Sequence, residues 1–164
     1  MKDEPSKTVV RAWARLMRAQ QTALAQIQAK LKAADLPPLE WYDAMLELER
    51  AGEAGMRPFE LERAMLLPQY SLSRLIDRLE EAGYVERRPH DQDRRGHVLA
   101  LTKAGRERRR SMWPIYAAAI KSAVGDRLSA DEAAALDVLL GKLIAPSAHP
   151  EPSAAKRAWR RPAF

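Results

Sequence analysis

The most constraining feature of this chain is one helical segment whose apolar residues form an unbroken stripe. The segment, residues 69–83, reads Q-Y-S-L-S-R-L-I-D-R-L-E-E-A-G. Leu72, Leu75, Ile76 and Leu79 have the spacing of a single helix face, and Gly83 predicts the end of the helix. Directly upstream, a proline opens a shorter helical pattern at residues 58–65. A short helix joined by a tight turn to an amphipathic one predicts a helix-turn-helix.

Helical periodicity extends to both sides of this pair. Apolar residues predict helices over about residues 8–34, 39–51 and 103–127, and from an S-A-D-E capping box at 129–132 to Ile144. Pro37 and Pro38 end the first helix, and Pro114 predicts a kink in the third. Each of these helices needs an apolar surface to pack against.

Two short apolar runs predict a β-hairpin. They cover residues 84–89 and 98–102, and the loop between them, residues 90–97, reads H-D-Q-D-R-R-G-H. The predicted fold class is therefore mainly α with a small β-hairpin wing, as in a winged helix-turn-helix.

The helix of residues 69–83 is a candidate surface for binding DNA. In a helix-turn-helix the second helix enters the major groove, and hydroxyl, amide and guanidinium groups contact phosphates and base edges there. Its outward candidates are Gln69, Ser71, Ser73, Arg74 and Arg78. Taken alone, the same pattern equally fits the solvated face of an ordinary amphipathic helix.

The hairpin shifts the balance toward nucleic acid. Arg94 and Arg95 at its tip can enter a neighbouring minor groove, and Asp93 is placed to hold Arg95 in a salt bridge. Residues 86–110 contain nine Lys or Arg against four Asp or Glu, and the whole chain carries a net charge of +6. A basic excess concentrated in one region is typical of a nucleic-acid surface.

Composition excludes several other classes of function. The chain has no cysteine, so thiol chemistry and thiolate metal sites are excluded, and we predict neither a metal site nor a cofactor. No known catalytic motif occurs among its 164 residues, so an enzyme is not expected. No apolar run reaches the roughly 20 residues that cross a bilayer, and the N-terminus has no apolar signal core, so we expect a cytoplasmic protein.

Residues 57–105 resemble the winged helix-turn-helix of MarR-type bacterial regulators. The resemblance rests on L-x-x-x-G-Y-V-E-R at residues 79–87 and on the D-x-R of residues 93–95, which precedes the L-T-x-x-G of residues 101–105. With the flanking helices it covers about residues 8–145.

The resemblance implies a homodimer that binds a near-palindromic operator. Residues 8–36 and 103–145 would form the helical dimerisation lobe, and residues 39–102 the winged helix-turn-helix, within one domain of residues 1–145. The recognition helices would enter successive major grooves, and Arg94 and Arg95 the minor groove. The apolar residues of both terminal helices support a dimer independently. The basic, proline-containing tail, residues 146–164, is expected to be poorly ordered without a partner.

The resemblance also implies a small effector. The W-Y-D motif of residues 41–43, with a tryptophan in the first helix, resembles the branch of the family that responds to urate or aromatic acids. Candidate ligand-binding residues are Trp13, Met17, Trp41 and Asp43, with Arg74 or Arg87 as the arginine that links ligand to DNA helix. Core or dimer packing of the tryptophans, and a structural partner such as Arg63 or Arg74 for Asp43, are the alternatives.

The sequence thus predicts a sequence-specific DNA-binding regulator, a homodimeric repressor released by a small aromatic or urate-like ligand. The alternative is a winged-helix adaptor that uses its basic face to bind an acidic protein.

Overall fold

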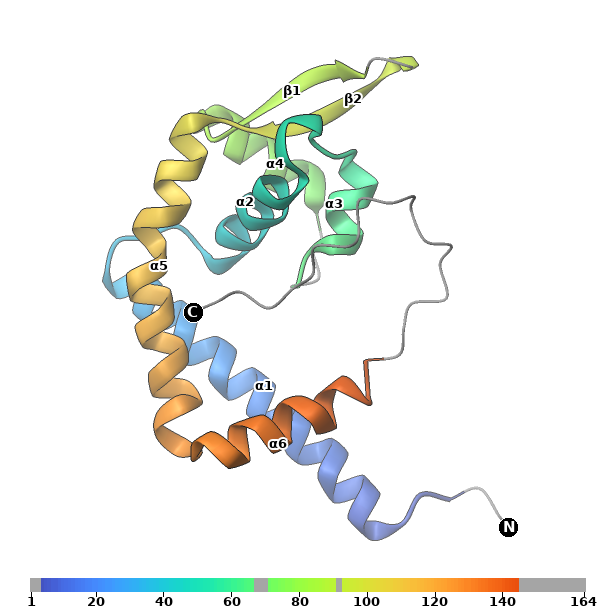
Figure 1. The fold of residues 1–164 in the computed structure, drawn as a ribbon, viewed down its shortest axis with the longest axis vertical. Helices are drawn as coiled ribbons and strands as arrows, with labels where there is room; N and C mark the ends of the chain where they lie inside the picture. Colours follow the sequence, from blue (N-terminus) through green and yellow to red (C-terminus); the bar gives the residue numbers. More distant parts are fainter. Residues whose placement is uncertain (1–3, 67–70, 91–92, 145–164) are drawn as a thin grey trace. The chain divides into compact units, whose positions relative to one another are not determined.

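The computed structural model describes residues 4–66, 71–90 and 93–144, with the backbone alone for residues 90 and 93–95. The chain forms two compact units, Met1–Arg127 and Leu128–Phe164. Figure 1 shows the elements of the first unit, which are helices with one antiparallel hairpin at the edge. Among the described residues no helix is long and apolar enough to cross a membrane.

The first unit opens with the two helices that the sequence predicts. Helix α1 spans Lys7–Ala33, and the Ser6 side chain caps it by accepting a hydrogen bond from the Val9 amide at 3.3 Å. Helix α2 spans Leu39–Ala51 and ends at Gly52, whose φ of 68° is costly for other residues. The predictions for both helices are confirmed to within one residue.

The helix-turn-helix pair follows. A 3-10 turn, η1 (Gly52–Ala54), leads to α3 (Pro58–Ala64), and α4 spans Leu72–Glu81. Gly83 lies just beyond α4 with a φ of +73°, as expected of a residue that ends a helix. The predicted pair is present, although Gln69 lies outside the described residues.

The hairpin, which we call the wing, is longer than the sequence indicated. Strand β1 (Val85–His90) pairs with β2 (Asp93–Leu101), with an irregularity between Pro89 and His90. The polar residues 93–97 therefore lie in a strand and not in a loop. The alternation of apolar and polar residues signals a strand only where one face is buried, and residues 93–97 contain no apolar side chain that could give this signal.

The last helices are shorter than predicted. Helix α5 spans Lys103–Ala123 and contains Pro114, and a separate 3-10 turn, η2 (Gly125–Arg127), takes up the rest of the predicted segment. In the second unit, α6 spans Ala130–Gly141, whereas the prediction extended to Ile144. Ser129 and Glu132 form the predicted capping box.

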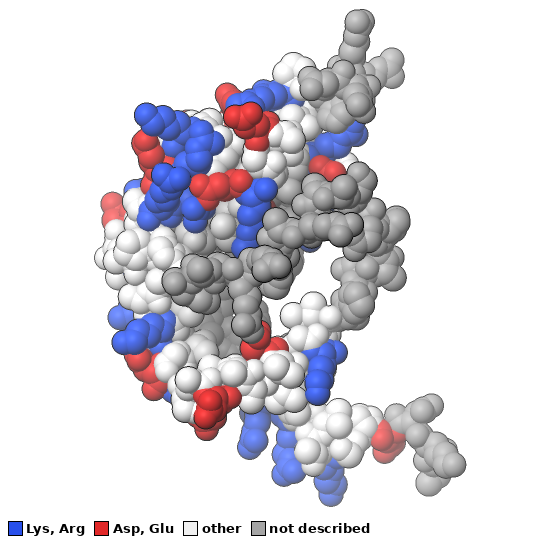
Figure 2. Space-filling model, in the orientation of Figure 1, with Lys and Arg blue, Asp and Glu red and all other residues white. Residues whose placement is uncertain are grey.

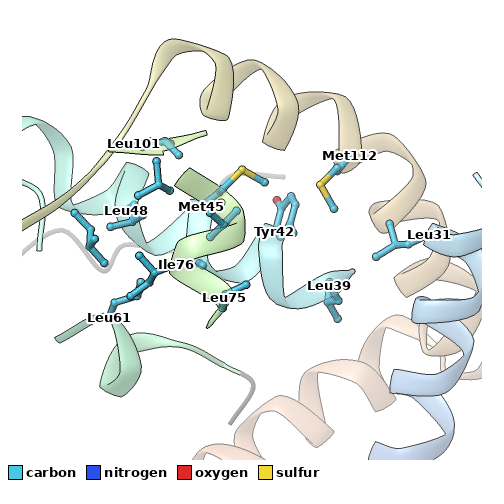
Figure 3. Packing of buried hydrophobic residues seen from close by; sticks show 14 of the residues in the cluster. Leu31, Leu39, Tyr42, Met45, Leu48, Leu61, Leu75, Ile76, Leu101 and Met112 are labelled. Atoms are coloured by element: carbon cyan, nitrogen blue, oxygen red, sulfur yellow. The ribbon is translucent and has the colours of Figure 1, made fainter. Parts of the chain in front are cut away.

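The core of the first unit surrounds α2. Met45 and Leu48 are fully buried, and they pack with residues from α1, α3, α4, the wing and α5 (Figure 3). Burying such a side chain stabilises the fold by about 1.5–3 kcal/mol. Met56 forms an isolated β-bridge with Leu99 of β2, exchanging backbone hydrogen bonds of 3.1 and 2.8 Å. The core thus fixes α4 and the base of the wing to the same support.

Candidate nucleic-acid interface

Helix α4 has one buried face and one exposed face. Leu75, Ile76 and Leu79 are at most 3% exposed, whereas the side chains of the opposite face are exposed: Ser73, Arg74, Asp77 and Arg78. Ser71 stands exposed at the start of the helix and forms no side-chain cap. These hydroxyl and guanidinium groups are free to donate hydrogen bonds to phosphate oxygens or base edges.

Arg87 ties the wing to α4. Its Nη2 lies 2.7 Å from Asp77 Oδ1, and its Nη1 contacts Glu80 Oε2. Arg87 was also a candidate for the arginine that links ligand to DNA helix, and in the structure it forms two ion pairs with α4. The pairing arises because Arg87 faces α4 from the strand, a contact that spacing along the chain does not reveal.

The tip of the wing carries the other predicted DNA-binding residues. The backbone places Asp93, Arg94 and Arg95 at the start of β2. Their side chains lie outside the described part of the structure, so the expected Asp93–Arg95 salt bridge stays a prediction. Lys and Arg side chains, with some acidic ones among them, gather over the wing and the start of α5 (Figure 2).

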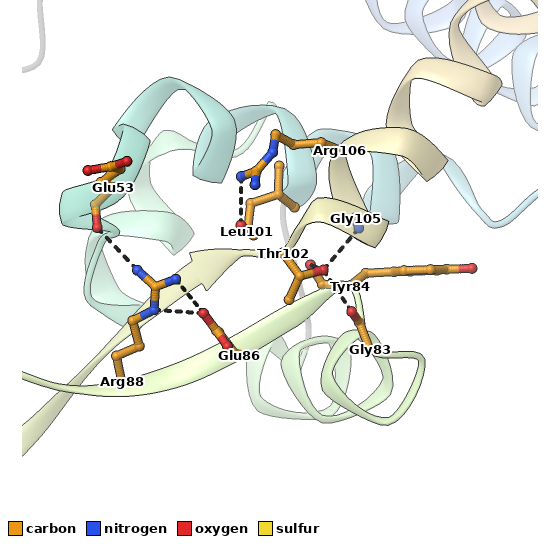
Figure 4. Close-up of polar contacts among 9 residues, drawn as sticks. All are labelled: Glu53, Gly83, Tyr84, Glu86, Arg88, Leu101, Thr102, Gly105 and Arg106. Atoms are coloured by element: carbon orange, nitrogen blue, oxygen red, sulfur yellow. Dashed lines mark hydrogen bonds and ion pairs between the residues drawn. The ribbon is translucent and has the colours of Figure 1, made fainter.

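The root of the wing, which we define as Gly83, Tyr84 and Leu101–Gly105, is fixed by one threonine. Thr102 Oγ1 donates a hydrogen bond to the Gly83 carbonyl at 2.7 Å and accepts one from the Gly105 amide at 3.0 Å (Figure 4). Gly105 lies so close to Tyr84 that a Cβ atom there would be 2.2 Å from the Tyr84 carbonyl oxygen. The direction in which α5 leaves the wing is therefore set locally.

A second contact, not predicted from the sequence, joins α2 to α5. Arg109 pairs with Glu49, and its Nη1 donates to the Tyr42 hydroxyl at 3.2 Å. Burial raises the pKa of Tyr42, and the nearby Arg109 charge opposes that shift. Tyr42 also stacks with Trp113 and meets Tyr116 edge-on, with ring centroids 6.2 and 4.9 Å apart. The run of arginines at residues 108–110 was the available signal, but the sequence did not show which of them faces α2.

The structure places the predicted ligand residues in different environments. Trp41 packs against the core and meets Tyr84 edge-on at 6.1 Å, and its buried Nε1 has no acceptor among the described residues. Asp43 is 6% exposed, and its charge adds to the burial that raises the pKa of Glu47 and Tyr116. Trp13 and Met17 are 63% and 38% exposed and do not belong to the core cluster or to the residues packed on it. Within one copy of the chain, Trp41 packs against the core and Asp43 is buried, whereas Trp13 and Met17 are exposed.

Metal chemistry finds no support in the described residues. No three His, Asp or Glu side chains gather there as a metal site would require. His97 is exposed on β2, and residues 91 and 92 lie outside the described part of the chain.

Comparisons with known proteins agree on one family. Residues 34–96 match the model of the MarR family. The chain is 32% identical over 91 residues to the multiple antibiotic resistance protein MarR of Escherichia coli K12, covering 56% of this chain and 63% of that protein. It is 37% identical over 71 residues to the transcriptional repressor MprA of the same organism, covering 43% and 40%. The matches thus span about two fifths to three fifths of these curated relatives.

The fold is similar to that of a solved DNA complex. Sco3205 of Streptomyces coelicolor, a MarR family transcriptional regulator crystallised with DNA, superposes with a TM-score of 0.75 at 25% identity. The similarity covers 87% of this chain and 91% of that one. It therefore includes the helices on both sides of the winged helix-turn-helix.

Proposed function

This chain belongs to the MarR family of transcription regulators, which are not enzymes, and from this premise we propose that it represses transcription by binding operator DNA as a homodimer. The observation that carries the proposal is the exposed polar face of α4, held on the same core as a basic wing. Relatives that are repressors, and a structural relative solved with DNA, support it.

The proposed base-reading surface is the N-terminal half of α4. Ser73 and Arg74 are exposed on its outer face and would contact base edges, with Ser71 and Arg78 on phosphates. Asp77 is already paired with Arg87, so it holds the wing in place and does not contact DNA. Gln69, outside the described residues, completes the proposed set.

The wing would supply the minor-groove contact. Arg94 and Arg95 follow the hairpin tip, where a narrow groove attracts guanidinium groups. Asp93 would orient Arg95 by pairing with it, because a carboxylate has no favourable contact with phosphate. The ion pairs of Arg87 with α4 would keep this tip in register with the recognition helix.

The proposed homodimer is supported by apolar side chains that one chain leaves exposed. They occur on α1, α5 and the segment around α6, and include Val9, Trp13, Ile115, Leu139 and Leu143. Exposed apolar surface of this kind, concentrated on terminal helices, is typical of a permanent interface between copies. DNA with two half-sites about 34–36 Å apart would then match the two recognition helices.

We further propose that a urate-like or aromatic acid releases the repressor. Trp41 and Asp43 on α2 would form the ligand site with Trp13 and Met17 of α1. The buried Trp41 Nε1, which has no acceptor among the described residues, supports this because an anionic ligand oxygen would satisfy it. Such a ligand would favour a dimer in which the recognition helices no longer match the operator spacing.

Fluorescence anisotropy tests the DNA proposal. The purified chain is titrated into DNA from upstream of its own gene and into random DNA, over a salt series, with and without urate. We expect preference for the upstream DNA, a steep salt dependence and weakening by urate. Equal binding to both DNAs with a shallow salt slope would contradict the proposal and favour the acidic-protein adaptor.

Variants locate the contacts. Arg95→Ala should weaken operator binding about tenfold or more while the protein stays folded, because it removes the minor-groove contact. Lys32→Ala removes an equal charge from the exposed end of α1 and is the matched control.

Arg74→Ala should change sequence preference. An equal loss of affinity for specific and random DNA would reassign Arg74 to phosphate contact.

Trp13→Phe with an unchanged urate response would remove Trp13 from the ligand site.

A further inference from the structure

A cavity of about 700 Å³ lies beside the root of the wing, and the proposed DNA contacts do not use it. Its walls are the end of α2, η1, the wing and the first turn of α5. Figure 4 shows several of the wall residues. None of the residues of α4 lines it, and neither do Trp13, Met17, Trp41 or Asp43. It is therefore a separate site from the one proposed for the effector.

The floor of the cavity is apolar. Leu48, Ala100 and Leu101 line it and are at most 5% exposed, so their positions are fixed by the core. A ligand that buries an apolar side chain on this floor would gain about 25 cal/mol for each Å² removed from water.

The rim of the cavity is charged, and part of that charge is neutralised within the protein. The Glu86 carboxylate accepts a hydrogen bond from Arg88 Nε at 2.7 Å, and Glu49 pairs with Arg109, which lies outside the cavity. These two acidic residues are already matched by arginines. They leave three charged side chains on the rim to consider: Glu53, Lys103 and Arg106.

Those three charges have weak partners or none among the described residues. Glu53 accepts a hydrogen bond from Arg88 through its backbone carbonyl, at 3.5 Å, and its carboxylate forms no ion pair there. Arg106 Nη1 donates to the Leu101 carbonyl at 2.9 Å, and no carboxylate within the described chain pairs with this guanidinium (Figure 4). Lys103 Nζ is 3.9 Å from Glu107. One carboxylate thus stands on the η1 side and two cations stand on the α5 side.

We propose that this cavity binds a small zwitterion with an apolar side chain, a free amino acid or a short peptide. Its ammonium group would pair with Glu53, its carboxylate with Arg106 and Lys103, and its side chain would cover the leucine floor. A ligand with a single charge satisfies one side of the rim and leaves the other unmatched. The arginine fork suits a carboxylate because it can donate two parallel hydrogen bonds.

The size of the cavity favours the peptide over the amino acid. Small-molecule sites of about 300–1,000 Å³ enclose drug-sized ligands, which are larger than one leucine. Leu-Leu is therefore the first probe and leucine the second. Tighter binding of Leu-Leu than of leucine would identify a short peptide, and equal binding a free amino acid.

Isothermal titration calorimetry on the full chain without DNA tests the proposal, so its outcome is independent of the DNA-binding function. Leu-Leu should bind at least tenfold more tightly than N-acetyl-Leu-Leu, which lacks the ammonium, and than Leu-Leu amide, which lacks the carboxylate. Binding of either blocked peptide as tightly as Leu-Leu would overturn the proposal. It would also be overturned if neither leucine nor Leu-Leu bound at about 10 mM.

Two charge-removing variants identify the site. Glu53→Gln and Arg106→Met should each weaken Leu-Leu binding at least tenfold. Glu62→Gln and Arg110→Met remove the same charges from exposed positions outside the cavity, and we expect changes below twofold. Far-UV circular dichroism confirms folding of each variant. Undiminished binding by folded Glu53→Gln would contradict the assignment even if Arg106→Met failed to fold.

Discussion

Helices α4 and α6 are similar in length and opposite in how they use their apolar residues. Three residues of α4 are buried against the core, and its exposed face is polar. Helix α6 has no buried residue, and Val138 and Leu139 are 60% and 57% exposed, as are Leu143 and Ile144 beyond its end at 68% and 75%. The apolar side of α4 is covered by the core of the first unit, whereas the apolar residues in and after α6 are exposed.

The difference indicates two kinds of partner. The polar face of α4 has the hydroxyl and guanidinium groups that suit DNA, whereas the leucines around α6 suit another apolar surface. A second copy of this chain offers such a surface. The comparison can be tested by altering each helix where its role is expected to be strongest.

Leu79→Ala should have the largest effect, because Leu79 is fully buried under α4. The cavity left behind should lower the free energy of unfolding by about 2–5 kcal/mol, measured by urea denaturation. Glu81→Ala, at an exposed position of the same helix, is the control and should change it by less than about 0.5 kcal/mol. An equal small change in both variants would mean that α4 does not depend on the core.

Leu139→Glu combined with Leu143→Glu should leave the chain folded and monomeric. Two carboxylates in the proposed apolar interface would not be solvated, so the proposed dimer should dissociate and operator affinity should fall about a hundredfold. Sedimentation equilibrium and anisotropy measure the two effects. Lys142→Glu is the control, because Lys142 is exposed and lies between Leu139 and Leu143 in the sequence. A dimer that survives the double change would break the comparison.

Much of this contrast could be predicted from the sequence, because it depends on periodicity within single helices. The stripe Leu72, Leu75, Ile76 and Leu79 predicted the core-facing side of α4, on which Leu72 is half-buried and the other three are buried. The S-A-D-E run predicted the cap of α6. Contacts between distant segments could not be predicted in this way. Arg109 is 60 residues from Glu49, and one of several neighbouring arginines had to be the one that faces α2.

Arg87→Met should have a moderate effect on DNA binding and little on stability. Its ion pairs with Asp77 and Glu80 are about one-third to one-half exposed, and such pairs contribute at most about 1 kcal/mol. Operator affinity should nevertheless fall about tenfold, because the wing loses its tie to α4. Arg88→Met removes the same charge from the other face of β1, where Arg88 pairs with Glu86. Equal losses in the two variants would show that only charge matters.

The capping box of α6 should give the smallest effect. Glu132 Oε2 accepts a hydrogen bond from the Ser129 amide at 2.8 Å, and this bond, with one from the Ser129 side chain, lowers the pKa of Glu132. The stability from this carboxylate is therefore present above its ordinary pKa of 4.5 and is lost as the pH falls through the lowered value. Ser129→Ala should reduce the helical circular dichroism signal at 222 nm at neutral pH. It should also reduce the further loss of this signal that we expect as the pH falls below about 4.5. Asp137→Asn should leave that step intact.

The wing shows where sequence reasoning was least accurate. Residues 93–97 looked like a loop because they are polar, yet they form a strand, since the backbone of Asp93 and His97 still pairs with His90 and Pro89 of β1. The prediction of the ligand residues was incomplete for a related reason. Trp13 and Trp41 are both tryptophans on predicted helices, but only Trp41 packs on the core. The identity of a residue does not determine how its side chain packs.

Gly105 makes the root of the wing intolerant of change. Any Cβ atom at this position would collide with the Tyr84 carbonyl and lie 2.6 Å from Leu101 Cδ1. In a library of all twenty residues at position 105, selection for repression should return glycine alone. If two copies pair through their terminal helices, the same contact helps to set the distance between the two recognition helices. The angle at which each α5 departs from its wing would then determine how many base pairs separate the two halves of the operator.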